Sequence, residues 1–175
     1  MLGELPNGPY VAFLGSLRVA LELKRLDHSL SEFEHCPSWL APIVALAVCT
    51  GMRQSEILNL RWLDVDLSQG RILLPQTKNG EGRTVYLNET ASAALLSLPI
   101  AEQTRSTDKV FDGVSADYVT QVFRKTCRSL AIEDFTFHDL RHTAASWLRM
   151  TGADIHSVAT LLGHKDLRMA RATIT

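Results

Sequence analysis

Residues 65–87 read VDLSQGRILLPQTKNGEGRTVYL, and this stretch decides the fold class of the chain. Short apolar or β-branched runs occur at 65–67, 71–74 and 83–87, and glycine-bearing turns separate them. Short β-rich runs joined by such turns are typical of an antiparallel meander. We therefore expect three adjacent antiparallel strands in this part of the chain.

On both sides of this stretch the spacing of apolar residues is that of helices. Upstream, a strongly apolar helix is expected from about Ser38 to Thr50, where Gly51 breaks it. The apolar side of the next helix is expected to hold Ile57, Leu58, Leu60 and Trp62. Downstream, helices are expected over 88–98, 116–130, 137–150, 154–162 and briefly from Asp166. The predicted fold class is mostly α with a small three-stranded antiparallel sheet (α+β).

Composition limits the function classes. With 175 residues, of which 46% are hydrophobic, the chain can bury one substantial core. Its cysteines are far apart and form no CxxC pair, which favours reduced thiols. The sequence shows neither an apolar run of membrane-spanning length nor a signal-peptide pattern, so we expect a cytoplasmic protein without a membrane partner. The net charge of −1 does not by itself suggest nucleic acid, and a basic excess is confined to 123–128 and 138–171.

Two stretches could place a cation beside an anionic ligand. In TGMRQSEILNL, residues 50–60, the glycine break puts Arg53 near the start of the following helix, where helix polarity already favours an anion. Arg53 could therefore hold a phosphate or simply pair with Glu56. Lys78 falls in the second predicted turn of the meander, where it is either a solvated charge or a proton donor to a bound ligand.

Two later motifs carry histidines. In HDLRH, residues 138–142, His138 and Arg141 are three positions apart at the start of a helix, so both should project from one face. A guanidinium and an imidazole together can bind phosphate and move a proton. The opposite side of that helix is expected to pack through Ala144, Ala145, Trp147 and Leu148. In LLGHK, residues 161–165, His164 follows a helix end, where it is either a cap or a ligand contact.

Taken in order, these motifs resemble the catalytic domain of the tyrosine recombinase (phage integrase) family. The resemblance covers about 39–170 and implies that residues 36–175 form a catalytic domain, with 1–35 as an N-terminal linker or helical segment. It also implies the substrate and partners: double-stranded DNA and other recombinase protomers, with no metal ion and no other cofactor. Candidate DNA contacts on the helix over 116–130 are Arg124, Lys125 and Arg128.

The resemblance implies a role for each matched residue. Arg53 and Arg141 would hold the scissile phosphate, and Glu56 would orient Arg53. Lys78 would protonate the departing 5′-oxygen, while His138 would act as a general base or proton relay. The remaining expected phosphate contact is His164.

One position departs from the family pattern. A tyrosine, the nucleophile that forms a 3′-phosphotyrosine, is expected about nine residues after His164, but Thr173 stands there. The chain is therefore expected to be C-terminally incomplete as a catalytic domain and inactive in strand cleavage by itself. Two other readings stay open. One is a non-catalytic DNA-binding remnant or regulator of recombinases; the other, remote, is a zinc peptidase in which HDLRH replaces HExxH.

Overall fold

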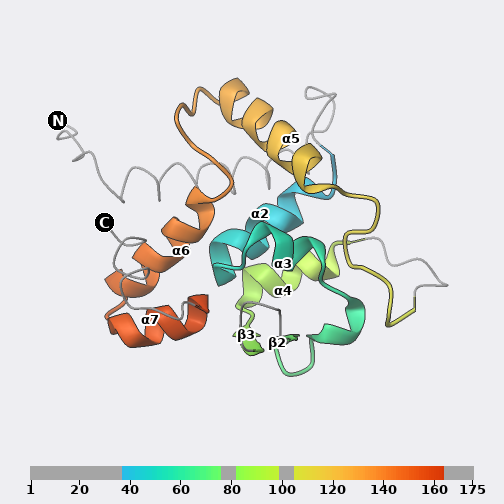
Figure 1. The fold of residues 1–175 in the computed structure, drawn as a ribbon, viewed down its shortest axis with the longest axis vertical. Coiled ribbons are helices and arrows are strands. Elements are labelled where there is room, and N and C mark those ends of the chain that lie inside the picture. The colour runs from blue at the N-terminus through green and yellow to red at the C-terminus, as the bar shows by residue number, and fades with distance from the viewer. Residues whose placement is uncertain (1–36, 76–81, 99–104, 164–175) are drawn as a thin grey trace.

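The computed structural model describes residues 37–75, 82–98 and 105–163, which form a group of helices with a small sheet at one edge in the view of Figure 1. Before and within the sheet region the elements are α2 (Leu40–Thr50), α3 (Gln54–Leu58), the 3-10 helix η1 (Trp62–Asp64), β1 (Val65–Asp66), β2 (Arg71–Leu74) and β3 (Arg83–Tyr86). After it come α4 (Glu89–Leu96), α5 (Ala116–Ser129), α6 (Asp139–Met150) and α7 (Ile155–Leu162). In Figure 1, α5 lies at the top of the view and α7 at the lower left.

The sheet is the predicted antiparallel meander. Its strand order is β1-β2-β3, and Ile72 of β2 pairs with Val85 of β3. Both of these side chains are buried, whereas Leu73 and Tyr86, one position further along each strand, are exposed. This alternation is expected for a sheet with one face on the core. The predicted fold class is confirmed.

Helix α2 lies at the centre of the core because it is apolar on nearly every side. Its fully buried side chains are Leu40, Ile43, Val44, Leu46 and Ala47. Helices α4 and α6 pack against it. On α5 the buried residues include Phe123, whose ring meets that of Phe137 edge-on at 5.4 Å between centroids.

The expected second helix is shorter than the sequence pattern indicates. It ends at Leu58, so Leu60 lies outside the helix and Trp62 belongs to η1. The backbone leaves the helix because it pairs with a distant segment. The carbonyl of Leu60 accepts from the N–H of Val110 at 2.9 Å, and the N–H of Trp62 donates to the carbonyl of Asp108 at 3.2 Å.

The other helices agree with the sequence to within about two residues at each end. Asn88 caps α4, since its side chain accepts from the N–H of Ala91 at 2.9 Å. The side chain of Trp147 is 42% exposed, so the expectation that it packs into the core is wrong. The helix expected from Asp166 lies outside the described residues. Among the described helices, none is both long and apolar enough to cross a bilayer.

Candidate active site

The site begins at the turn between α2 and α3. Gly51 ends α2 in a left-handed conformation with φ of 66°, which a residue with a Cβ adopts only under strain. A Cβ at this position would also overlap the side chain of Leu162. The turn places Arg53 at the N-cap of α3, as the sequence predicts.

Arg53 and Glu56 are joined twice. The backbone N–H of Arg53 donates to Oε2 of Glu56 at 2.8 Å, and its Nη1 donates to Oε1 at 3.0 Å. The first bond satisfies an otherwise unpaired N–H at the helix start. The Arg53 side chain nevertheless stays 40% exposed, compared with 12% for Glu56. Arg53 is therefore the member of the pair that solvent or a ligand can reach.

A residue that sequence reasoning missed completes this group. Arg83, the first residue of β3, donates from Nη1 and Nη2 to the two carboxylate oxygens of Glu56 at 2.8 and 2.9 Å. A signal for it was present, because Arg83 lies two positions before the buried Val85 on the same face of its strand. A charged residue facing inward on a strand needs a buried partner.

Arg141 is the buried cation of the site, with 3% of its surface exposed. Its guanidinium donates to the carbonyl of Gly51 and to the carbonyl of Leu162. Burial, and then the charge of Arg53, lowers the pKa of Arg141 to about 10. Arg141 is therefore still protonated at neutral pH.

Three consecutive carbonyls at the end of α7 anchor the three arginines. Leu161 accepts from Nε of Arg83 at 3.2 Å, Leu162 accepts from Arg141, and Gly163 accepts from Nη2 of Arg53 at 3.3 Å. The last carbonyls of a helix lack intrahelical partners and carry partial negative charge, so cations are favoured there. The end of α7 thereby gathers guanidinium groups from α3, β3 and α6.

The charges in this cluster do not cancel. Three guanidinium groups face the one carboxylate of Glu56, so these four side chains carry two more positive than negative charges. Burial alone would raise the pKa of Glu56, but the hydrogen bonds from Arg83 and the backbone of Arg53, with the charges of both arginines, lower it to about 2. Glu56 thus stays ionised, and the surplus positive charge suits an anion such as a phosphodiester.

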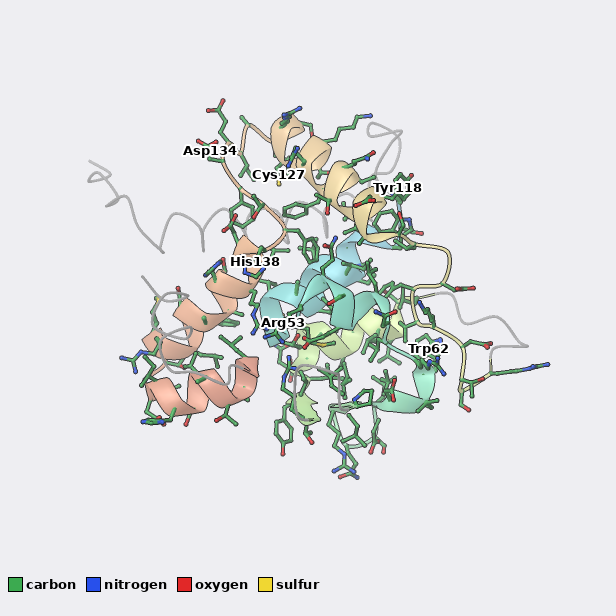
Figure 2. The ribbon with its side chains drawn as sticks, in the orientation of Figure 1. Arg53, Trp62, Tyr118, Cys127, Asp134 and His138 are labelled. Atoms are coloured by element: carbon green, nitrogen blue, oxygen red, sulfur yellow. The ribbon has the colours of Figure 1, made fainter. Side chains whose placement is uncertain are left out.

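His138 lies beside this cluster at the start of α6, and Figure 2 labels it together with Arg53. Its partial burial lowers its pKa from the usual 6.5, helped by the charges of His142, Arg141 and, less strongly, Arg53. The rings of His138 and His142 meet edge-on at 5.0 Å between centroids. A neutral imidazole at pH 7 can accept a proton.

The remaining predicted site residues fall in two groups. Lys78, His164 and Thr173 lie outside the described residues. The candidate DNA contacts are all exposed on α5, at Arg124, Lys125 and Arg128. In Figure 1 this helix and α7 are far apart in the view, so α5 would be a second contact surface rather than part of the arginine cluster.

The geometry does not favour the zinc peptidase alternative. Asp139, which would have to be the general base, accepts from the N–H and hydroxyl of Thr136 at 2.7 and 2.6 Å. These bonds tie the Asp139 carboxylate to the turn that precedes α6. Within the described ranges, no three His, Cys, Asp or Glu side chains converge as metal ligands would.

Residues 20–173 match the model of the phage integrase family. The chain belongs to this family. It is 37% identical over 130 residues to the shufflon-specific DNA recombinase of Escherichia coli, which covers 74% of this chain and 33% of that protein. It is 32% identical over 166 residues to the integrase of Salmonella phage P22, with 86% and 41% of the two chains covered. This family member thus spans less than half the length of these relatives.

Solved structures agree with the family and the fold. The crystal structure of XerA recombinase superposes with a TM-score of 0.71 at 26% identity, over 88% of this chain and 56% of that one. A lambda integrase(75–356) dimer bound to a COC′ core site superposes with a TM-score of 0.68 at 20% identity, over 94% and 57%. The second match supports the fold alone.

Proposed function

We propose that this family member is the DNA-binding catalytic domain of a site-specific tyrosine recombinase, and that its arginine cluster holds a phosphodiester of double-stranded DNA. The observation that carries the proposal is the half-exposed Arg53 beside the buried, charged Arg141, with Glu56 as the one carboxylate in the cluster. Forked guanidinium groups match the geometry of phosphate oxygens. Positive charge fixed in advance also stabilises charge that develops on the phosphate during attack.

The individual roles follow from position and chemistry. Arg53 and Arg141 bind the non-bridging oxygens, and Glu56 orients Arg53. His138, whose pKa is lowered, takes up a proton at neutral pH. Lys78 protonates the departing 5′-oxygen and His164 donates to the phosphate, two roles that rest on the family resemblance.

None of the residues assigned above is a nucleophile that could attack the phosphate. Position 173, where the resemblance places a tyrosine, holds threonine. A threonine alkoxide is far harder to form than a phenolate, whose parent pKa is about 10. We therefore propose that the 175-residue chain binds DNA without forming a covalent link. The same observation favours the second candidate function, a non-catalytic DNA-binding regulator of active recombinases.

DNA and recombinase protomers are the proposed partners, and the cytoplasm, where DNA is accessible, is the proposed location. Support for the DNA partner comes from the similarity to a DNA recombinase at 37% identity and to a phage integrase at 32% identity, while the protomer partner rests on the family resemblance. Further phosphate contacts are proposed for the exposed basic side chains of α5, Arg124, Lys125 and Arg128.

The affinity for a fluorescent duplex tests the proposal. We expect Arg53→Gln to raise the Kd at least about tenfold, because it removes a charge-assisted contact to phosphate. The matched control is Arg149→Gln, since Arg149 is exposed in the last turn of α6 and caps a carbonyl, that of Ala153. Equal affinities for Arg53→Gln and Arg149→Gln would refute a special role for the cluster.

A further inference from the structure

Arg83 belongs to none of the site motifs, yet all three nitrogens of its guanidinium group donate hydrogen bonds within the protein. Its Nη1 and Nη2 form two parallel bonds to the Glu56 carboxylate, and its Nε donates to the carbonyl of Leu161. Each of its guanidinium nitrogens therefore has an acceptor within the protein. The side chain is only 14% exposed. Arg83 is thus directed into the protein rather than toward a ligand.

Glu56 is saturated by two arginines. Its Oε1 accepts from Nη1 of Arg53 and Nη1 of Arg83, and its Oε2 accepts from the backbone N–H of Arg53 and Nη2 of Arg83. A carboxylate has about four acceptor sites, so all of them are occupied. Because Arg83 of β3 donates to both oxygens, the orientation of the Glu56 carboxylate relative to Arg53 is fixed.

We infer that Arg83 is a positioning residue, which holds the Glu56 carboxylate in place and through it fixes the guanidinium of Arg53 for the phosphate. The inference rests on the proposed phosphate-binding role of Arg53. It adds a third arginine to the proposed phosphate site. This arginine contacts Glu56 and the backbone of Leu161 rather than the phosphate.

A second consequence concerns protonation. The charged groups around Glu56 are Arg53 on its own turn, Arg83 from β3 and Arg141 from α6. Without Arg83, the burial of Glu56 would be opposed by the backbone hydrogen bond and charge of Arg53 and by the charge of Arg141. The pKa of Glu56 should then rise from about 2, and a protonated Glu56 would no longer hold Arg53.

The test is a double-mutant cycle in the whole 175-residue chain, with Kd for a duplex as the readout. We expect Arg83→Gln and Glu56→Gln each to weaken binding about tenfold, and the double variant to be no weaker than Glu56→Gln alone. Arg83→Lys, which keeps the charge but loses the fork, should recover part of the loss. The matched control is Arg71→Gln, because Arg71 begins β2 and pairs with Asp66 at 3.4 Å on the same sheet. It should stay within about twofold.

Additive losses would overturn the inference, since Arg83 would then act independently of Glu56. Equal effects of Arg83→Gln and Arg71→Gln would overturn it too. If Arg83→Gln fails to fold, Arg83→Lys takes its place in the cycle.

In parallel, a ¹³C titration of the Glu56 carboxyl should show a higher pKa in the Arg83 variant, and an unchanged pKa contradicts the inference. If Arg53→Gln leaves the Kd unchanged, the proposed function fails; if only Arg83→Gln does, the inference alone fails.

Discussion

The guanidinium of Arg141 donates a hydrogen bond to the backbone carbonyl of Gly51, 90 residues earlier in the chain. This bond ties α6 to the turn that presents Arg53. Because Arg141 is buried, its charge is stabilised by carbonyl dipoles of that turn and of α7 rather than by water. Stability and the binding site therefore depend on the same side chain.

Arg141→Lys should lower both stability and DNA affinity. A lysine keeps the charge but does not reach both carbonyls in the planar fork, so one is left unsatisfied. We expect the free energy of unfolding to fall by about 1–3 kcal/mol in urea denaturation. Arg149→Lys on the exposed side of the same helix should change it by less than about 0.5 kcal/mol. Equal changes would mean that the buried bonds contribute nothing.

Glu56 should make stability depend on pH in the acid range. Its folded pKa of about 2 lies below the ordinary 4.5, so the stabilisation is present above pH 4.5 and is lost as pH falls toward 2. Glu56→Gln should cost about 2 kcal/mol at pH 7. The difference in unfolding free energy between the two proteins should shrink between pH 4.5 and 2. A constant difference across this range would show that Glu56 is not held ionised by the arginines.

Gly163→Ala should disturb the site, whereas Gly152→Ala should affect stability only. Both glycines have positive φ, 65° and 91°, so both substitutions introduce backbone strain of about 1 kcal/mol. A Cβ at Gly163 would also approach Nη1 of Arg83 to 3.0 Å, while one at Gly152 would meet nothing within 4 Å. DNA affinity should therefore fall for Gly163→Ala alone. An equal loss for both would point to a general effect on folding.

His138 should titrate below its ordinary pKa of 6.5 in an NMR experiment. Removing His142, which contributes to this shift after burial, should raise the pKa of His138 in the variant His142→Asn. Because the folded value is depressed, the contribution of His138 to stability is lost as pH falls below 6.5. A pKa of 6.5 or above for His138 would contradict its proposed role as a base that is neutral at pH 7.

The 175-residue chain should form no covalent adduct with a nicked duplex. Threonine at position 173 does not replace the expected tyrosine, so denaturing electrophoresis should show only free DNA. A phosphotyrosyl adduct that maps to Tyr10, Tyr86 or Tyr118 would contradict this expectation.

The sequence predicted the elements well where the signal was local. Turn glycines locate the strands, and the spacing of apolar residues locates α4 to within about two residues. The end of α3 was misplaced because it depends on pairing between Leu60 and Val110, which no local pattern contains. Helical spacing predicts a buried Trp147, but this side chain is exposed and the buried residues of α6 include Arg141.

The site was predictable only in part, for a similar reason. Arg53, His138 and Arg141 stand in recognisable motifs. Arg83 was missed because its partner Glu56 is 27 residues away. The hydrogen bonds from the three arginines to the end of α7 could not be predicted either, because every residue has a backbone carbonyl whatever its side chain. Local spacing showed which side chains have suitable chemistry, while the contacts that hold them depend on the tertiary fold.

The most direct test of the central claim is the salt dependence of duplex binding by the wild type and by Arg53→Gln. Each phosphate contact contributes about 0.9 to the slope of log K against log salt concentration. If the cluster holds a phosphodiester through Arg53, the slope should be smaller by about 1 in the variant. Identical slopes would contradict the claim, because they would show that Arg53 neutralises no phosphate.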